Sequence, residues 1–216
     1  MSIELYTGTP GSGKSLDACR TIRRALKRGQ HVITNFEVNV NEDCKGTVSY
    51  YPNNELNPGV LVAFAHDHWA SNAFKEDSIL IVIDEAQLIW NSRLWNSDPF
   101  RMQWLELFSQ HRKYGMRIIL ICQSDIMIDR QFRTLVEYEV RHIKVGHLGL
   151  LGMIMKSLSF GELFYAKSFY YGEKVKVDSY FFRYSKKLGS MYDTLNTFAQ
   201  LPAGTAKAVT ARDCAM

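Results

Sequence analysis

The amino-acid sequence predicts an α/β protein in which a mainly parallel sheet has helices on both faces, with a β-hairpin elaboration toward the C-terminus. Strand-like and helix-like segments alternate over roughly the first 145 residues, which is typical of a parallel sheet. Ile79 to Ile83 and Ile118 to Cys122 are apolar on both faces, as strands covered by helices on two sides must be. From Glu139 onward, β-branched and aromatic residues recur between glycines, which favours hairpins.

The chain has 216 residues, enough to bury a core without a metal or a disulfide. Its composition, 46% hydrophobic and 22% charged, excludes disordered, collagen-like and simple coiled-coil proteins. The four cysteines form no CxxC pair, so neither a zinc site nor a disulfide framework is expected. We expect a core over residues 1–145, a β-rich elaboration packed on it over 146–201, and a mobile tail or connector over 202–216.

Charge is distributed unevenly along the chain. The formal net charge is +4, but residues 1–129 hold 13 basic and 15 acidic side chains whereas residues 130–216 hold 13 and 7. The basic last third suits a surface that faces phosphates, although an ordinary solvated face explains it equally well. We expect no signal peptide and no membrane span, because the longest apolar run, Leu148 to Met155, is far shorter than the roughly 20 residues that a spanning helix needs.

The first elements follow one another closely. Ile3 to Thr7 is expected to be a strand, and Leu16 to Arg28 a helix with cationic residues at its end and Gly29 at its left-handed cap. His31 to Phe36 is expected to be the next strand.

The middle of the chain has weaker signals. Asn39 to Gly59 is rich in turn formers and is expected to be irregular, with Leu61 to Ala65 a short strand after it. Between the two apolar strands, Trp104 to Tyr114 is expected to be a helix that ends at Gly115.

A complete phosphate-loop motif, G-x-x-x-x-G-K-[ST], lies between the first strand and the first helix. Its residues, all expected to bind a nucleotide, are Gly8, Thr9, Pro10, Gly11, Ser12, Gly13, Lys14 and Ser15. Glycines let backbone N–H groups turn toward phosphate oxygens, and the helix N-terminus adds positive potential. Lys14 is expected to reach the β- and γ-phosphates of ATP and the Ser15 hydroxyl to ligate Mg²⁺. A glycine-rich turn that binds nothing is the alternative.

Two adjacent carboxylates, Asp84 and Glu85, follow the strand Ile79 to Ile83. Open α/β sheets bind ligands at the carboxyl ends of their strands. Asp84 is therefore expected to hold Mg²⁺, directly or through water, and Glu85 to orient the water that attacks the γ-phosphate. The alternative is a helix N-terminus that simply favours acidic residues.

Gln123 follows the other buried strand and is expected to contact the γ-phosphate or the attacking water, unless it merely ends the strand. Together with Glu85 it indicates the additional-strand class of P-loop NTPase, with Ile118 to Cys122 as the strand between the phosphate-loop strand and the acidic one. Most such enzymes act as rings in which a neighbouring subunit supplies an arginine. Arg133 is the favoured candidate, and Arg112 and Arg93 are its competitors.

Longer motifs resemble one family. The loop YTGTPGSGKS, the strand end IVIDEAQ, the stretch from Gln110 to Gln123, and the late aromatic residues Phe182-Arg183-Tyr184 and Met191-Tyr192 are similar to those of the zonula occludens toxin (Zot) family, which includes filamentous phage assembly ATPases. The basic triplet His111-Arg112-Lys113 departs from the more usual basic pair followed by His.

The resemblance implies an ATP-hydrolysing motor domain for the assembly and extrusion of filamentous phage, acting as a homo-oligomeric ring at the cytoplasmic face of the bacterial inner membrane. It implies phage assembly and coat proteins as partners. Members normally continue into a membrane span, so we expect anchoring through a missing downstream segment or through a partner. The toxin activity belongs to the extracytoplasmic part of the family and is not assigned here.

Aromatic and basic side chains alternate between Tyr165 and Arg183, a combination that binds single-stranded DNA by stacking and phosphate contact. Half-buried strands produce the same pattern. Two other functions therefore stay open: a DNA-translocating or packaging ATPase of the same core fold, and a non-catalytic nucleotide-binding scaffold associated with a membrane.

Overall fold

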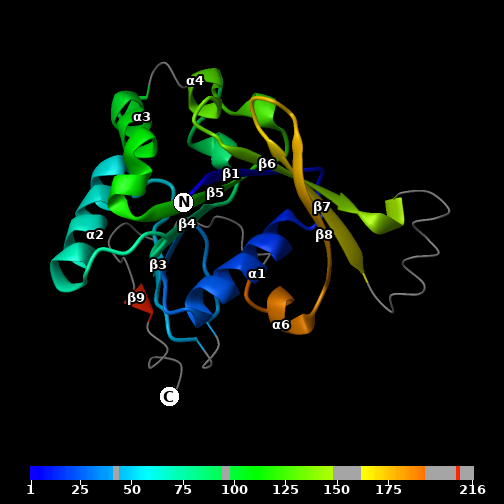
Figure 1. Ribbon diagram of the computed structural model, residues 1–216, viewed down its shortest axis with the longest axis horizontal. Coiled ribbons are helices and arrows are strands. Elements are labelled where there is room, and N and C mark those ends of the chain that lie inside the picture. Colours follow the sequence, from blue (N-terminus) through cyan, green and yellow to red (C-terminus); the bar gives the residue numbers. More distant parts are fainter. Residues whose placement is uncertain (41–43, 94–97, 148–161, 193–207, 210–216) are drawn as a thin grey trace.

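The computed structural model describes residues 1–40, 44–93, 98–147, 162–192 and 208–209. The strands of this part form one sheet in the order β8-β7-β6-β1-β5-β4-β2-β3-β9 (Figure 1). Their bounds are β1 Ile3–Thr7, β2 His31–Thr34, β3 Val48–Tyr50, β4 Ile79–Ile83, β5 Met116–Ile121, β6 Tyr138–Lys144, β7 Leu163–Tyr170, β8 Lys176–Arg183 and β9 Ala208–Val209. The strands from β6 to β3 pair in parallel, while β7, β8 and β9 pair antiparallel. The expectation of a mainly parallel sheet is confirmed.

The strand order also confirms the additional-strand arrangement. Ile118 of β5 pairs with Ile3 of β1 on one side and with Ile81 of β4 on the other. The strand that precedes the phosphate loop and the strand that precedes Asp84 are therefore separated by β5. All three end at the same edge of the sheet, because they are parallel.

Helices cover both faces of the sheet (Figure 1). The α-helices are α1 Lys14–Lys27, α2 Pro58–Ser71, α3 Arg101–Gln110, α4 Arg130–Arg133 and α6 Lys186–Gly189. Short 3-10 helices are η1 Ala86–Leu88, η3 His111–Tyr114, η4 Asp125–Met127 and η5 Val145–His147. In Figure 1, α2, α3 and α4 lie on one side of the sheet and α1 and α6 on the other.

Alternation along the central strands divides the core into two layers. Ile79, Ile81 and Ile83 belong to the cluster that includes the side chains of α2 and α3, whereas Leu80 and Val82 belong to the cluster around α1. All five side chains are at most 2% exposed. This two-sided burial explains why the strand is a continuous apolar run in the sequence.

The first helix agrees with its sequence signals. α1 ends at Lys27, and Gly29 takes the left-handed conformation (φ 79°) that an L side chain rarely adopts. The strand expected over His31 to Phe36 is shorter, because β2 ends at Thr34.

The expectation of a strand over Leu61 to Ala65 is wrong, because these residues lie inside α2. Asn57 caps this helix by accepting a 3.1 Å hydrogen bond from the amide of Val60, and Pro58 occupies the first turn. Proline at that position and asparagine before it are helix-start signals. The preceding segment, expected to be irregular, contains the short strand β3.

The helix expected over Trp104 to Tyr114 is present but divided. α3 begins at Arg101, and its last expected turn is the 3-10 helix η3. Gly115 ends it with φ 70°, and a Cβ atom there would lie 2.5 Å from Cζ2 of Trp69. Glycine is thus required both by the backbone conformation and by the close approach of the indole.

The C-terminal hairpin extends the same sheet. β6 pairs in parallel with β1 and antiparallel with β7, and β7 pairs antiparallel with β8. The apolar run Leu148 to Met155 lies outside the described residues. Of the segment expected to be a mobile tail, the described residues Ala208 and Val209 form β9 against β3.

Candidate active site

The phosphate loop connects the carboxyl end of β1 to the amino end of α1. Gly8, Gly11 and Gly13 have φ values of 145°, 74° and 95°. At Gly8 a Cβ atom would lie 2.6 Å from the carbonyl oxygen of His142 and from Oγ of Ser12. The loop therefore requires glycine at position 8 for its conformation as well as for the close approach of His142 and Ser12.

The loop has the features of an anion cradle. The Ser12 side chain is 2% exposed, and its Oγ has no hydrogen-bond partner among the described residues. The amino group of Lys14 turns back over the loop and donates to the carbonyl oxygens of Gly8 (2.7 Å) and Thr9 (3.1 Å). Burial lowers the pKa of Lys14, and the nearby carboxylates of Asp84 and Glu85 oppose that shift. A buried donor without a partner, a cationic side chain and a helix N-terminus fit a triphosphate.

Ser15 and Asp84 meet across the end of the sheet. Ser15 Oγ donates a 3.3 Å hydrogen bond to Asp84 Oδ2, and the amide of Glu85 donates to Asp84 Oδ1 at 2.8 Å. Burial raises the pKa of Asp84, and the bonds from the Glu85 amide and the Tyr192 hydroxyl oppose it. One hydroxyl and one carboxylate, both hard oxygen ligands, fit Mg²⁺, which takes the rest of its ligands from water and phosphate.

Asn35, which the sequence did not single out, fixes the backbone of Asp84. Its side chain is 1% exposed. Its Oδ1 accepts from the amide of Asp84 at 2.7 Å, and its Nδ2 donates to the Asp84 carbonyl at 2.8 Å. The signal in the sequence is a polar residue at the end of an apolar strand, and the strand expected over His31 to Phe36 includes it.

Glu85 lies directly after Asp84 in a strained conformation. Its φ of 48° places it in the left-handed region, which costs a non-glycine residue about 1–3 kcal/mol. Its carboxylate Oε2 accepts a hydrogen bond from Gln87 Nε2. Such strain is often found at functional sites, and here it turns the chain sharply from β4 into η1.

Gln123 lies beside the phosphate loop. Its carbonyl oxygen accepts a 3.3 Å hydrogen bond from the amide of Gly8, so the end of β5 is tied to the first residue of the loop. The Gln123 side chain is exposed. The fold therefore brings together the phosphate loop, the two carboxylates and Gln123 at one edge of the sheet.

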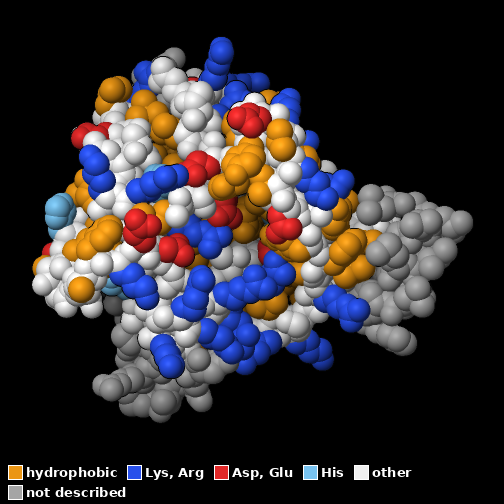
Figure 2. All heavy atoms as spheres, in the orientation of Figure 1, with side chains coloured by type: hydrophobic (Ala, Val, Ile, Leu, Met, Phe, Trp, Pro, Cys, Tyr) orange, Lys and Arg blue, Asp and Glu red, His pale blue; other side chains and the backbone are white. Residues whose placement is uncertain are grey.

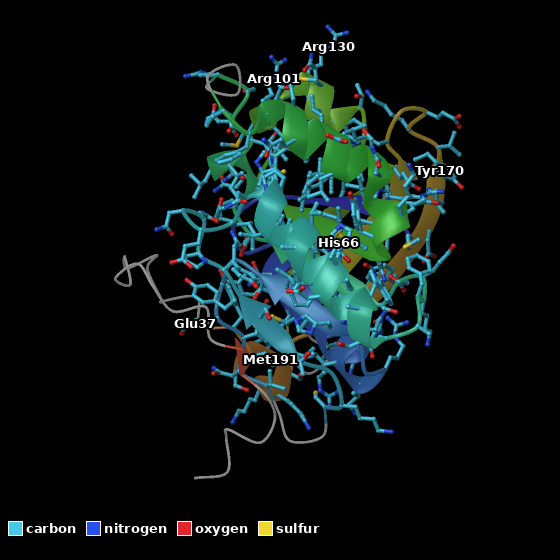
Figure 3. All side chains as sticks on the ribbon, turned by 90° about the vertical axis from the view of Figure 1, so that its left-hand side faces the viewer. Glu37, His66, Arg101, Arg130, Tyr170 and Met191 are labelled. Atoms are coloured by element: carbon cyan, nitrogen blue, oxygen red, sulfur yellow. The ribbon has the colours of Figure 1, made fainter. Side chains whose placement is uncertain are left out.

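The arginine candidates differ in their surroundings. Arg133 Nη1 is 3.6 Å from Asp125 Oδ2, and that carboxylate oxygen also accepts from the Tyr171 hydroxyl at 3.0 Å. Arg112 forms a 2.9 Å ion pair with Glu137, and Arg93 is exposed. In Figure 3, Arg130 of α4 and Arg101 of α3 project at one end of the molecule, away from Met191.

A buried polar cluster joins α1 to the hairpin and was also missed. Asp17, fully buried, accepts hydrogen bonds from His142 Nε2 (3.0 Å) and Tyr180 Oη (2.6 Å), and it pairs with Arg20 at 2.7 Å. Burial alone would raise the pKa of Asp17, but the partners outweigh it and hold that pKa below its ordinary value. Because Asp17 lies one turn after Lys14, the cluster fixes the start of α1 against the sheet.

The aromatic and basic residues of the hairpin divide between its two faces. Phe182 and Tyr180 point into the layer with α1, where Arg20 lies over both rings. Tyr165 and Phe181 stack on the opposite face, with centroids 4.6 Å apart, and Phe181 is 52% exposed. The second face carries the exposed Phe181 ring, which is available to a partner.

Basic side chains gather on another part of the surface. Figure 2 shows Lys and Arg side chains clustered over α1 and α6. The cationic residues on these helices account for part of the positive charge that the sequence carries.

Comparison with known sequences identifies the family. The profile described as Zonular occludens toxin (Zot) matches residues 2–193. This chain belongs to the Zot family. The match includes the phosphate loop, the Asp84–Glu85 pair, Gln123 and the hairpin, so the resemblance expected from the motifs is confirmed.

Two phage proteins are similar to this chain in sequence. The chain is 30% identical over 176 residues to the Gene 1 protein of Enterobacteria phage I2-2, covering 76% of this chain and 46% of the relative. It is 30% identical over 138 residues to ORF301 of Pseudomonas phage Pf3, which is named as an assembly protein. That match covers 62% of this chain and 40% of the relative. The chain thus spans less than half the length of these relatives.

Solved structures confirm a P-loop NTPase fold. The N-terminal domain of zonular occludens toxin from Neisseria meningitidis superposes with a TM-score of 0.52 at 20% identity, covering 89% of this chain and 98% of that one. The genome packaging NTPase B204 of Sulfolobus turreted icosahedral virus 2, solved with ATP-gammaS, superposes with a TM-score of 0.51 at 13% identity. The match covers 82% of this chain and 95% of that one. At these identities the likeness concerns the fold.

Within the described part of this Zot chain, no helix combines the length and apolarity of a membrane span.

Proposed function

We propose that this chain is the ATP-hydrolysing motor domain of a filamentous phage assembly protein. The observation that carries the proposal is the hydrogen bond between Ser15 and Asp84, because it joins the phosphate loop to the acidic strand end in the arrangement that Mg-ATP requires. Family membership and the relatives in phages I2-2 and Pf3 support the assembly role.

Each side chain then has one task. Lys14 exchanges the carbonyl oxygens of Gly8 and Thr9 for the β- and γ-phosphates. Glu85 orients a water molecule toward the γ-phosphate and accepts its proton. Gln123 donates its amide to the γ-phosphate or the same water. Ser15 and Asp84 would hold Mg²⁺, which would neutralise charge on the phosphates.

Measuring ATP turnover tests the proposed hydrolytic activity. Mg²⁺-dependent ATP hydrolysis should be abolished by Lys14→Ala and retained by Lys45→Ala, an exposed lysine whose amide bonds to Leu26 at the far end of α1. Equal turnover in wild type, Lys14→Ala and Glu85→Gln would reject the enzymatic assignment. In the full-length protein, phage particle release should fail with Lys14→Ala and continue with Lys45→Ala.

The chain acts as a homo-oligomeric ring, and Arg133 is the residue supplied to the neighbouring site. This role requires Arg133 to exchange its partner Asp125 for a phosphate. Turnover that rises more steeply than protein concentration would support assembly into an active ring. Partial recovery of activity when Arg133→Ala is mixed with Lys14→Ala would support a contribution from the neighbour, and Arg112 and Arg93 are tested in the same way.

The proposed location and partners of the domain follow from the phage assembly role. The domain acts at the cytoplasmic face of the bacterial inner membrane, with coat and other assembly proteins as partners and with anchoring through further sequence or a partner. Residues 1–145 serve as the ATPase core and 146–201 as an elaboration packed on it. Recovery of the protein with inner membranes from phage-producing cells, together with coat protein, tests this placement.

A DNA-translocating ATPase is the second candidate, favoured by the stack of half-buried Tyr165 on exposed Phe181, with Lys167 over the Tyr165 ring at 5.4 Å. It predicts hydrolysis stimulated by single-stranded DNA, with a steep salt dependence that Phe181→Ala weakens. A non-catalytic membrane-associated scaffold is the remaining alternative, and it predicts membrane association unaffected by Glu85→Gln.

A further inference from the structure

A cavity of about 320 Å³ opens beside the phosphate loop, at the amino end of α1. Its walls come from three parts of the chain: Gly13 and Leu16 at the start of α1, Phe164 of β7, and Tyr184 and Leu188 around α6. Its surface is mainly apolar. The size lies at the lower end of the range of about 300–1,000 Å³ that small-molecule sites occupy.

The walls are held in place by packing. A Cβ atom on Gly13 would lie 2.6 Å from Cδ1 of Phe164, so this ring rests directly on the phosphate loop. Phe164 in turn stacks on Phe182, with centroids 5.4 Å apart. On the other side, a Cβ atom on Gly189 would clash with the Tyr184 hydroxyl oxygen.

The segment that carries Tyr184 and Leu188 is anchored at both ends. Ser185 caps α6 by accepting from the amide of Leu188 at 3.3 Å. Met191, labelled in Figure 3, is fully buried, and its carbonyl oxygen accepts from the amide of Asn39 at 3.1 Å. The cavity therefore exists before a ligand enters, which reduces the entropic cost of binding.

We propose that this cavity binds the nucleobase of the nucleoside triphosphate, with the base stacked on Tyr184 and packed against Leu188 and Phe164. The inference rests on the proposed function and extends it to the base. The cavity shares Gly11, Lys14 and Ser15 with the phosphate cradle, so a ligand whose phosphates lie in the loop can extend into it. A flat aromatic base matches an apolar slot with a tyrosine ring at its mouth.

The same walls predict weak selection among bases. The described residues that line the cavity include no Asn, Gln, Asp or Glu side chain that could read the edge of a base. A site distinguishes bases strongly when its own buried polar groups would be left without partners by the wrong one. ATP and GTP should therefore bind within a fewfold of each other.

Comparing the affinity for a nucleotide with that for inorganic tripolyphosphate separates the contribution of the nucleoside from that of the phosphates. With Mg²⁺, calorimetric titration of wild type should show ATP and GTP binding at least tenfold more tightly than tripolyphosphate. Tyr184→Ala should weaken ATP about tenfold, equivalent to about 1.4 kcal/mol, and leave tripolyphosphate unchanged. Tyr184→Phe should retain the wild-type affinity. Phe181→Ala, which removes an exposed ring from the other face of the hairpin, should change neither.

A second variant fills the cavity instead of opening it. Leu188→Trp should weaken ATP and GTP without weakening tripolyphosphate, whose affinity reports that the loop is folded. Equal loss of ATP and tripolyphosphate affinity in both variants, or no loss of ATP affinity in either, would overturn the base site. In the second case the phosphate site would remain supported. A wild-type protein that binds neither ligand would overturn the proposed function as well.

Discussion

The hydroxyl of Tyr192 donates a 3.0 Å hydrogen bond to Asp84 Oδ2, the same oxygen that accepts from Ser15. Burial, and after it the charge of Asp84, raises the pKa of Tyr192, so the hydroxyl stays protonated and can donate. The Tyr192 ring packs edge-on against Phe36, with centroids 5.0 Å apart. The segment after α6 thus reaches the carboxylate that we assign to the metal.

Removing this hydroxyl should change the Mg²⁺ requirement. Tyr192→Phe keeps the ring against Phe36 but frees Asp84 Oδ2 from a donor that competes with the metal. We expect the Mg²⁺ concentration for half-maximal ATP binding to fall about tenfold or more, because hydrogen bonds to charged groups contribute about 1.5–3 kcal/mol and about 1.4 kcal/mol is a factor of ten. A Mg²⁺ titration of nucleotide binding measures this. A higher Mg²⁺ requirement in the variant would show that Tyr192 assists the metal instead.

Asp84 should reduce stability while serving function. Burial raises its pKa, so the folded state binds its proton more readily than the unfolded state does, and the ionised form costs stability at neutral pH. Asp84→Asn should therefore raise Tm at pH 7–8, by about 2–4 °C for each kcal/mol recovered, and abolish hydrolysis. The gain should shrink as the pH falls through the raised pKa of Asp84. A gain that grows toward low pH would contradict this account.

Asn35 should be essential for the position of Asp84. In Asn35→Ala the buried amide and carbonyl of Asp84 lose their partners, which should cost about 1–3 kcal/mol of unfolding free energy and reduce turnover. Asn39→Ala is the matched control, because its exposed amide makes a single 3.1 Å bond to the Ser190 carbonyl. Chemical denaturation of both variants gives the comparison, and equal losses would reject the special role of Asn35.

The motifs predicted most of the fold and the phosphate site because their signals are local. Glycine spacing identifies the loop around Lys14, and two apolar runs identify β4 and β5 with their polar ends at Asp84 and Gln123. The position of β5 was also predictable, because Glu85 and Gln123 together indicated a strand between β1 and β4, whereas the order of the outer strands was not predicted.

What was missed depends on tertiary contacts or on weak local signals. α2 was missed because its apolar residues do not form a single helical stripe, and the cap at Asn57 was overlooked. Asn35, Asp17 and Tyr192 act on partners 49, 125 and 108 positions away. No spacing rule in the sequence points to such pairs.

Acid should destabilise the protein through His31. Burial, with a smaller contribution from His68, lowers the pKa of His31 to about 4, so the unfolded state binds its proton first as the pH falls from about 6.5. Unfolding free energy should therefore drop between pH 6.5 and 4, by up to about 3 kcal/mol at 1.36 kcal/mol per pKa unit.

His31→Gln should remove this component of the pH dependence. His66→Gln is the control, since Figure 3 shows His66 on the outer side of α2, and it should retain the wild-type slope. Denaturant titrations at several pH values measure both. A slope that survives His31→Gln unchanged would assign the acid sensitivity to other groups.

Glu85→Gln tests the central claim most directly, because it removes the group proposed to orient water and keeps the size and hydrogen-bonding capacity of the side chain. The variant should bind ATP with wild-type affinity in the presence of Mg²⁺ and hydrolyse it at least about 100-fold more slowly, the lower limit of a general-base contribution. Unchanged hydrolysis with intact binding would contradict the assignment of Glu85, and loss of binding would show that it holds the nucleotide instead.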